Sequence, residues 1–563
     1  MSRPVPTRAL NVAEVEILET DVLVVGGGIA GHRAAIAAHD AGASVLMVYL
    51  ARGASPYVIG CNAPIGHADS RDNPAAYFED MVRGGYGLND RRLVEALCRN
   101  MGEAYWELAQ LGVPFAAEGA RVRQRRLSGN SFPRSVFVPE GVGLAILNSL
   151  AGRVRALGIR LLAGWKAVTL LEDDGEVVGA LAWRRHGDRL ACIRARSVVL
   201  ASGGIGRLYD DSTYPADVLS NSYGLGLRAG ARLVDMEFVQ FEPVVTVWPP
   251  ECRGMEMPTA MLAEGAQLIN GRGDRFMMRH NPGPAEVGIE KARLALFIQS
   301  EIDAGAGLPD GSVVFDTTHV PHELLEGYVS HCRRLRSAGL EPRDRGPHVR
   351  PAAHSQMGGL FIDADGWTGV PGLYAGGEAA GGVHGASRIA GNGCSDTVVF
   401  GALAGKGAAA GMLGIGGRDW PRILADALRP FEARMGGSRG RPSSELKDDL
   451  RRIMVRHVGL WRDRAGLEAG IAQIRAIMDG LDRSGGAGSW GEALASFEAR
   501  EVASVALVIA TAALLRTESR GAHQRRDHPA QDDTNWLRHI GFARDGAGDI
   551  TAGDITAEDI PIH

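Results

Sequence analysis

The chain has 563 residues, which is too long for one hydrophobic core and predicts about two to four domains. Hydrophobic residues make up 45% and charged residues 23% of it, as in an ordinary globular protein, and the net charge of -5 gives no reason to expect nucleic-acid binding. The six cysteines include no C-x-x-C pair, so we expect no metal and no iron–sulfur cluster in this chain itself.

The N-terminal sequence MSRPVPTRAL has neither the apolar core of a signal peptide nor a twin arginine. No stretch approaches the roughly 20 apolar residues that a membrane-spanning helix needs. We therefore expect a cytoplasmic protein with reduced cysteines and no direct membrane insertion, in which any membrane association comes through a partner.

A glycine cluster at residues 21–35, DVLVVGGGIAGHRAA, dominates the first part of the chain. Gly26, Gly28 and Gly31 fit the pattern G-x-G-x-x-G, which is typical of a strand, a tight turn and a helix whose N-terminus receives a pyrophosphate. An acid at the end of the next strand often holds a ribose hydroxyl, but here Tyr49 or Leu50 stands there. The sequence therefore predicts a dinucleotide site; the missing acid weakens the case for NAD but leaves the choice between FAD and NAD open.

The hydrophobic pattern predicts regular elements along the rest of the chain. Strands are expected at residues 16–25 and 44–50, with a β-rich stretch over 159–199 that turns at 173–176. Helices are expected at residues 29–41, 73–84, 90–111, 141–157, 445–457, 466–481 and 490–517. The stretch SVVLASGGIGRLY, residues 197–209, is a second apolar strand that enters glycines, and it would return the chain to the dinucleotide.

The composition changes between residues 243 and 350, where prolines and methionine-rich turns suggest an inserted domain. Residues 371–405 are again rich in glycine, like the expected nucleotide-binding region. After about residue 417 the chain becomes helical and charged. These shifts mark the domain boundaries that we expect.

Several motifs, in order, resemble the flavoprotein subunit family of succinate dehydrogenase and fumarate reductase, with its relatives L-aspartate oxidase and adenylylsulfate reductase. They are VVGGGIAG, VVLASGGIGRLY, RAGARLVDMEFVQFEP, LINGRGDRFM, HSQMGGLFID, VPGLYAGGEAAGGVHGASRIAGN, DTVVFG and RTESRGAHQRRDHPAQDDTNW. The resemblance covers residues 21–536. It implies an α/β fold with a Rossmann-like FAD-binding domain (1–243 and 351–417), an inserted α+β capping domain (244–350) and a C-terminal helical domain (418–563).

The resemblance also implies the residues that hold FAD. Glu378 follows an apolar run and would accept hydrogen bonds from a ribityl or ribose hydroxyl, and Asn221 stands where the family has an aspartate. The expected cofactor-binding residues are Gly26, Gly28, Ile29, Ala30, Gly31, Ser55, Gly60, Ala201, Ser202, Gly203, Asn221, Glu378, Arg388, Asn392 and Ser395. The family's flavin-linking histidine is missing from RGASPYVIG, residues 52–60, so we expect non-covalent FAD.

The family moves a hydride between the flavin and a carbon of a dicarboxylic acid. The resemblance implies that Arg293, in EKARLALF, handles the proton, and that His354 and Arg388 hold a substrate carboxylate, for which a planar guanidinium is well shaped. A surface arginine and a structural histidine are the plainer interpretations of Arg293 and His354. The charged segment around Arg520 is expected to be structural.

In half of the family's dicarboxylate site, this sequence has different residue types. Glu242 stands where the family has a histidine, and a carboxylate there would repel a substrate carboxylate. The family's Thr/Ser-Glu pair becomes Pro258 and Thr259, and its arginine becomes Leu262. Glu242 is therefore expected either to meet an amine, a hydroxyl or a solvated channel, or to pair with a nearby arginine such as Arg253 and touch no substrate.

The resulting hypothesis is an FAD-dependent oxidoreductase acting on a small carboxylic acid through a substrate pocket that departs from the dicarboxylate pattern. One alternative is an amino-acid oxidase similar to L-aspartate oxidase. Another is one subunit of an electron-transfer complex, which would need an iron–sulfur partner because this chain has no cluster ligands. The oligomeric state is left open.

Overall fold

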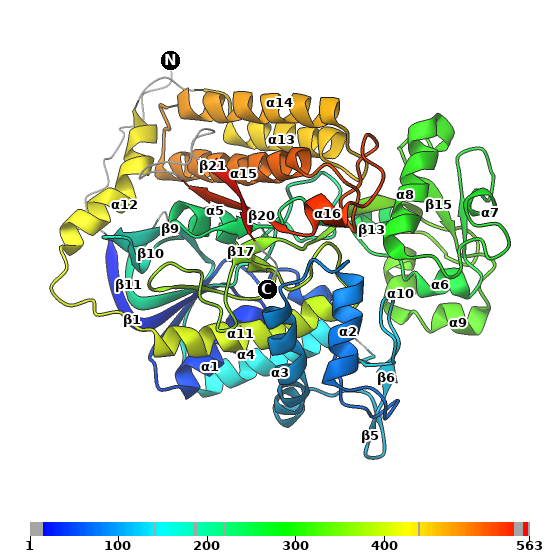
Figure 1. Cartoon of the computed structure of the whole chain (residues 1–563), viewed down its shortest axis with the longest axis horizontal. Coiled ribbons are helices and arrows are strands. Elements are labelled where there is room, and N and C mark those ends of the chain that lie inside the picture. Colours follow the sequence, from blue (N-terminus) through cyan, green and yellow to red (C-terminus); the bar gives the residue numbers. More distant parts are fainter. Residues whose placement is uncertain are drawn as a thin grey trace.

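The computed structural model describes residues 15–139, 141–184, 189–218, 221–436, 440–483 and 485–544, and the backbone of 555–560. Figure 1 shows a main body, in which a sheet lies between groups of helices, and a separate lobe at one side. The lobe is built from the middle of the sequence, and the last long helices stack along the opposite edge of the body from the first ones.

A seven-stranded sheet forms the centre of the main body, in the order β8-β2-β1-β11-β10-β9, with β18 pairing with β11. Strands β1, β2, β8, β11 and β18 run parallel, and β9 and β10 form the expected hairpin. Apolar runs such as 22–25 are buried on both faces, as parallel strands covered by helices require. The strands are β1 (Glu16–Val25), β2 (Val45–Tyr49), β8 (Arg160–Ala163), β9 (Trp165–Asp173), β10 (Glu176–Arg184), β11 (Arg189–Leu200) and β18 (Leu373–Ala375).

Helices pack below this sheet in the view of Figure 1. Helix α1 lies against α11 at glycines, since a Cβ at Gly405 would come within 2.2 Å of the Ala34 carbonyl oxygen. The expected helices of the first half are confirmed within one or two residues at each end. They are α1 (Ile29–Asp40), α2 (Pro74–Gly84), α3 (Arg91–Gln110) and α4 (Val142–Ala156), and α11 (Asn392–Ala410) joins them from the second half.

The lobe has a hydrophobic core of its own, which runs from Val244 to Val349 in the sequence. Its sheet has the order β13-β16-β15-β14. The capping domain expected at residues 244–350 stays a prediction. The elements are β13 (Val239–Trp248), α6 (Ala260–Ala263), β14 (Gln267–Ile269), α7 (Met277–His280), α8 (Lys291–Glu301), β15 (Val313–Asp316), α9 (His322–Glu326), α10 (Val329–Ser337) and β16 (His348–Gln356).

The C-terminal region is helical as expected, but most of its long helices share the hydrophobic core of the seven-stranded sheet instead of building a separate one. The region also ends in two strands, β20 and β21, which extend a small sheet containing β12 (Leu233–Val234) and β17 (Gly359–Phe361). The elements are α12 (Trp420–Met435), α13 (Ser443–His457), α14 (Arg464–Arg483), α15 (Trp490–Leu515), α16 (Asp533–Trp536), β20 (His539–Arg544) and β21 (Ile555–Ile560).

A fully buried group of charges joins the C-terminal region to the start of β13. Arg516 Nε donates to Glu237 Oε1 at 2.6 Å, and its Nη1 donates to Glu518 Oε1 at 3.0 Å. All three side chains are fully buried. Arg520 also binds Glu518, at 2.7 Å, so the charged segment that begins at Arg516 is structural, as expected from the sequence.

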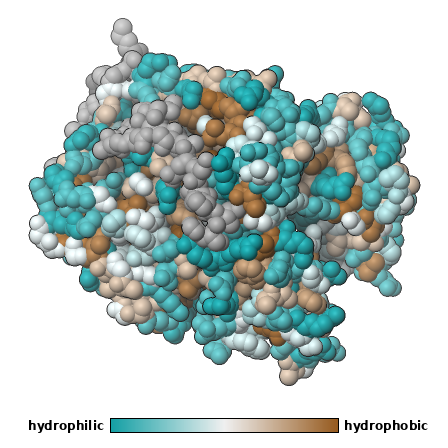
Figure 2. All heavy atoms as spheres, viewed as in Figure 1, coloured by the Kyte–Doolittle hydropathy of each residue, from teal (hydrophilic) through white to brown (hydrophobic). Residues whose placement is uncertain are grey.

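Among the described residues, no helix is long and apolar enough to cross a membrane. Figure 2 shows hydrophilic residues over most of the visible face, with apolar residues in patches separated by them.

We predict that Arg516→Met destabilises the protein by about 3–5 kcal/mol, because it leaves Glu237 buried without its counter-charge. The apparent melting temperature, followed by circular dichroism, should fall by several degrees. Arg464→Met is the matched control, since Arg464 is 60% exposed and pairs only at the surface with Glu468. Equal melting temperatures for the two variants would contradict the prediction.

Candidate active site

The glycine turn brings the ends of β1 and β11 together. Gly26 has φ +138°, and a Cβ there would lie 2.1 Å from the Ala201 carbonyl oxygen. A Cβ at Gly31 would lie 2.0 Å from the Gly26 carbonyl oxygen, so α1 can begin at this turn only with glycine at both positions. Ser55 Oγ accepts a hydrogen bond from the Ile29 N–H at 3.0 Å, at the N-terminus of the helix.

Residues from distant parts of the sequence face this turn. Ser202 Oγ lies 2.6 Å from Ser222 Oγ, which places the second glycine strand beside α5 (Asn221–Arg228). A Cβ at Gly204 would come within 2.6 Å of Glu378 Cδ, so Glu378 and the stretch after β11 line one space.

The Glu378 carboxylate is held from two sides. Its Oε1 accepts from the Gln356 N–H at 2.9 Å and from the Tyr214 hydroxyl. Burial raises the pKa of Glu378, although these two hydrogen bonds act in the opposite direction. The side chain is therefore fixed in position between the glycine-rich end of the main sheet and β16.

The first turn of α11 adds further polar groups. Asn392 Oδ1 accepts from the Tyr77 hydroxyl at 2.8 Å, and Ser395 Oγ donates to the Asn62 carbonyl oxygen at 2.8 Å. Gly60 lies just before Asn62, and a Cβ at Gly60 would meet Ser135 Oγ at 2.7 Å.

Several buried polar atoms around this region have no hydrogen-bond partner among the described residues. They are Asn62 Oδ1, Gln356 Oε1, Asn392 Nδ2 and Asp396 Oδ1. A polar ring system with its own donors and acceptors would satisfy such atoms. With the glycine turn at one end and these groups at the other, the residues fit FAD, whose flavin ring supplies hydride chemistry at N5.

Beside these residues, Arg388, His354 and Glu256 form a hydrogen-bonded chain. Arg388 Nη2 lies 3.0 Å from His354 Nε2, and His354 Nδ1 lies 3.1 Å from Glu256 Oε1. Because a guanidinium can only donate, His354 Nε2 accepts and Nδ1 carries the proton, with the Thr213 hydroxyl oxygen at 3.0 Å and Glu256 as its possible acceptors. Arg388 Nη2 also donates to Gln240 Oε1 at 3.3 Å.

Glu256 is ionised at neutral pH. Burial raises the pKa of this side chain, but the facing His354, Lys291 and Arg388 outweigh burial and hold the pKa at about 2. A carboxylate at this position fixes the orientation of the His354 ring.

Glu242, on β13, is buried and pairs with Lys291. The Lys291 ammonium lies 2.7 Å from Glu242 Oε1 and 2.9 Å from Oε2. The Arg253 partner suggested by the sequence is wrong, because Arg253 binds Asp211 at 2.7 Å. Ligand-type atoms of Glu242, Glu256 and His354 lie within 4.8 Å of one another, which would suit a metal ion, but the Lys291 ammonium already balances Glu242.

The structure does not bring Arg293 into this cluster. Its side chain is exposed on α8, and the guanidinium lies over the Phe297 ring, 5.7 Å from the centroid. The α8 residue that reaches the cluster is Lys291, two positions earlier. The sequence did not predict a role for Lys291 or Glu256. Glu256 lies in no recognisable motif, and Lys291 lies in EKARLALF, the stretch that was assigned to Arg293.

The segment that departs from the family pattern, residues 258–264, belongs mainly to the hydrophobic core of the capping lobe. Met261 and Leu262, on α6, are buried among its apolar residues. Glu264 follows α6 and accepts from the Tyr328 hydroxyl at 2.9 Å, so it is also engaged inside the lobe.

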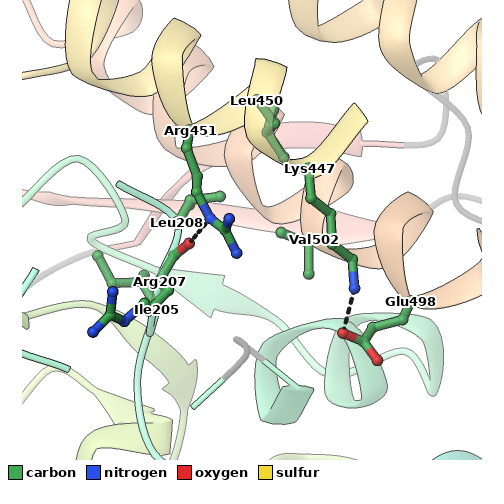
Figure 3. A pocket seen from close by; sticks show the side chains of 8 residues that line it. All are labelled: Ile205, Arg207, Leu208, Lys447, Leu450, Arg451, Glu498 and Val502. Atoms are coloured by element: carbon green, nitrogen blue, oxygen red, sulfur yellow. Dashed lines mark hydrogen bonds and ion pairs between the residues drawn. The ribbon is translucent and has the colours of Figure 1, made fainter. Parts of the chain in front are cut away.

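Figure 3 shows a hollow whose lining residues include none of this cluster. It lies between α13, α15 and residues 205–208. Its polar groups bind one another: Arg451 Nε donates to the Arg207 carbonyl oxygen at 3.0 Å, and Lys447 Nζ lies 2.6 Å from Glu498 Oε1. We interpret it as a packing gap between structural elements.

Two protein families match the chain. Residues 21–394 match the family described as the FAD binding domain, and residues 447–562 match the fumarate reductase flavoprotein C-terminal family. The first match includes the glycine turn, Glu378 and the Arg388 loop.

Known proteins resemble the chain over nearly its whole length. A fumarate reductase (CoM/CoB) subunit of Methanothermobacter marburgensis is 32% identical over 94% of this chain and 97% of its own. L-aspartate oxidase of Caulobacter vibrioides is 33% identical over 91% and 94%. A chain of E. coli quinol fumarate reductase has a TM-score of 0.88 at 27% identity, covering 98% and 99%. An adenylylsulfate reductase from Archaeoglobus fulgidus shares the fold at a TM-score of 0.77 and 19% identity. The chain therefore belongs to the flavoprotein family of fumarate reductase and succinate dehydrogenase, and it is an FAD-dependent oxidoreductase.

Proposed function

We propose that the enzyme moves a hydride between the flavin and a carbon next to a substrate carboxylate, which Arg388 and His354 hold. The observation that carries this proposal is the contact of 3.0 Å between Arg388 Nη2 and His354 Nε2, beside the residues that fit FAD. Arg388 Nε is buried and has no partner among the described residues, so donor capacity remains for a bound carboxylate. The planar guanidinium matches two carboxylate oxygens.

We further propose that the substrate carries one carboxylate in the pocket and not two. Glu242 and Glu256 add two negative charges to the cluster, and Lys291 and Arg388 add two positive ones. A second substrate carboxylate near Glu242 would meet a cluster without spare positive charge. A neutral or hydrogen-bond-donating group at the far end is compatible with these carboxylates.

An amino-acid oxidase is the second candidate. L-aspartate oxidase is among the relatives, and the carboxylates of Glu242 and Glu256 would accept hydrogen bonds from a substrate amine. Release of ammonia from amino acids, with flavin reduction, would favour this candidate over reduction of a carbon–carbon double bond.

An iron–sulfur partner is a further part of the proposal. The relatives include proteins named as subunits, and no C-x-x-C pair occurs in this chain to bind a cluster. Electrons would then pass between the flavin and clusters of a separate chain. Full activity of the isolated chain with its natural electron donor would argue against such a partner.

The substrate class can be tested by reducing the bound flavin anaerobically and adding α,β-unsaturated acids one at a time. We expect monocarboxylic acids to restore the absorbance of oxidised flavin faster than fumarate does, because Arg388 would pair with one carboxylate and the Glu242 carboxylate would repel a second one. If no carboxylic acid reoxidises the flavin, the proposed function is wrong. If fumarate is the fastest, the single-carboxylate assignment is wrong.

Replacing Arg388 should weaken the carboxylate clamp. We expect Arg388→Met to lose about 1.5–3 kcal/mol of charge-assisted hydrogen bonding, which is roughly a 10- to 150-fold fall in kcat/KM. Arg333→Met, at an exposed position on α10, is the control. The FAD content of both variants is measured first, since Arg388 also borders the flavin residues. Unchanged kcat/KM with FAD bound would contradict the clamp.

The flavin should be bound without a covalent link. Residues 52–60, RGASPYVIG, contain no histidine to form one. Acid precipitation of the protein should release all the flavin into the supernatant, where its absorbance is measured. A yellow pellet after repeated washing would show a covalent attachment and contradict this prediction.

A further inference from the structure

An exposed strip of arginines lies on the segment that contains the short strands β5 (Arg121–Val122) and β6 (Gln124–Arg125). Side chains alternate between the two faces of such a segment, and every second residue from 121 to 125 is an arginine. All four side chains of this arginine strip are exposed: Arg121, Arg123, Arg125 and Arg126. The chain as a whole carries a net charge of -5, so the strip is a local excess of positive charge on a negatively charged molecule.

No carboxylate in the described part of the chain forms an ion pair with the arginine strip. Two of its members donate to backbone carbonyl oxygens, Arg121 Nε to that of His67 at 2.6 Å and Arg126 Nε to that of Asn130 at 2.9 Å.

The other two guanidinium groups of the strip share one aromatic ring. Arg123 and Arg125 lie over Phe137, 5.9 and 3.6 Å from the ring centroid. Burial and the neighbouring Arg123 charge both lower the pKa of Arg125. The mutual repulsion of these charges opposes folding, whereas an approaching anion would be attracted by all four of them.

Residues that follow the arginine strip bond to the loop that carries Arg388. The Ala390 N–H donates to the Ser128 carbonyl oxygen at 3.1 Å, and Asn130 Nδ2 donates to the Ala390 carbonyl oxygen at 3.2 Å. The strip is therefore joined directly to the segment that would hold the substrate carboxylate.

The arginine strip also approaches the capping lobe. Figure 1 shows β6 below α10, where the lobe meets the main body. Burial raises the pKa of Tyr328, directly before α10, and the charge of Arg125 acts in the opposite direction, so Arg125 lies near this side chain. The Tyr328 ring contacts the ring of His331, with 6.4 Å between centroids, and His331 also bonds to the backbone of Glu256. The path from the strip to the substrate cluster therefore follows the junction of body and lobe.

We propose that the arginine strip attracts the anionic substrate and passes its carboxylate to Arg388; this deepens the proposed function and rests on it. Charges concentrated beside a binding site raise the local concentration of an oppositely charged ligand and the rate of encounter. The carboxylate exchanges one guanidinium for another until Arg388 and His354 bind it, and no covalent bond changes. Because the strip acts before the hydride transfer, it governs the association rate constant and leaves kcat unchanged.

A double variant removes half of the charge of the strip. Arg123→Gln with Arg125→Gln keeps polar side chains at two exposed positions and leaves Arg388 untouched. The control is Arg475→Gln with Arg483→Gln, which changes the net charge by the same amount at exposed positions on α14, at the top of Figure 1. The FAD content and the melting temperature of both double variants are measured first.

The experiment mixes the oxidised holoenzyme rapidly with a saturated monocarboxylic acid and follows the flavin absorbance, which yields association and dissociation rate constants. At about 0.01 M salt, where charges act over about 30 Å, we expect association about 3- to 10-fold slower in the strip variant than in the wild type. Dissociation should be unchanged, because Arg388 and His354 are untouched. At about 1 M salt, where the range is about 3 Å, the two enzymes should agree within about twofold. The control should match the wild type at both salt concentrations.

Turnover provides a second readout. With the unsaturated acid that reacts best, kcat/KM of the strip variant should fall by the same factor at low salt, with kcat unchanged. Equal association rate constants for strip variant and wild type at low salt would overturn the inference, and so would an equal fall in the control. A wild-type association rate constant that does not fall with salt would also overturn it, even if the strip variant did not fold.

The proposed function fails in a different way. A wild type whose flavin is neither perturbed nor reoxidised by any carboxylic acid would remove the proposed function, and with it the anionic substrate that the strip attracts.

Discussion

The buried contact between Arg516 and Glu237 holds together the parts of the molecule that make the site. Glu237 lies just before β13, and a second arginine, Arg462, donates to its backbone carbonyl oxygen at 2.7 Å. Burying such charges costs solvation free energy, and the cost is offset only while the partners stay in contact. The C-terminal region is therefore fixed against the strand that carries Gln240 and Glu242, although hundreds of residues separate them in sequence.

The substrate cluster lies where two cores meet. Strands β13 and β16 belong to the sheet of the capping lobe, but β16 also bonds to the flavin side: the Ala353 N–H donates to the Asp211 carbonyl oxygen at 3.1 Å, and its own carbonyl oxygen accepts from the Thr213 N–H at 3.0 Å. His354 is the next residue along β16, so these two hydrogen bonds also fix its position.

The site residues that match the family pattern and those that differ from it lie on different elements. Arg388 and Glu378 lie on the loops after β18, near the residues that fit FAD. The flavin and the reacting carbon would restrict which side chains can be accommodated there. Lys291 and Glu256 come from the capping lobe, where the main requirement is a packed core. We therefore propose that changes of polarity are easier to accommodate at the far end of the substrate than beside the flavin, and that the far end selects the acid.

The sequence by itself determined the glycine turn, the parallel strands and the Arg388 and His354 positions, because each depends on local geometry or on a motif of adjacent residues. Only the tertiary structure decided that Lys291 and not Arg293 reaches the cluster. Two positions on a helix differ by about 200° around its axis, and the packing of α8 on β13 selects the face that points inward. Tertiary packing likewise decided the pairing of β20 with β12, two strands that lie about 300 residues apart in the sequence. Local periodicity does not encode such distant partners.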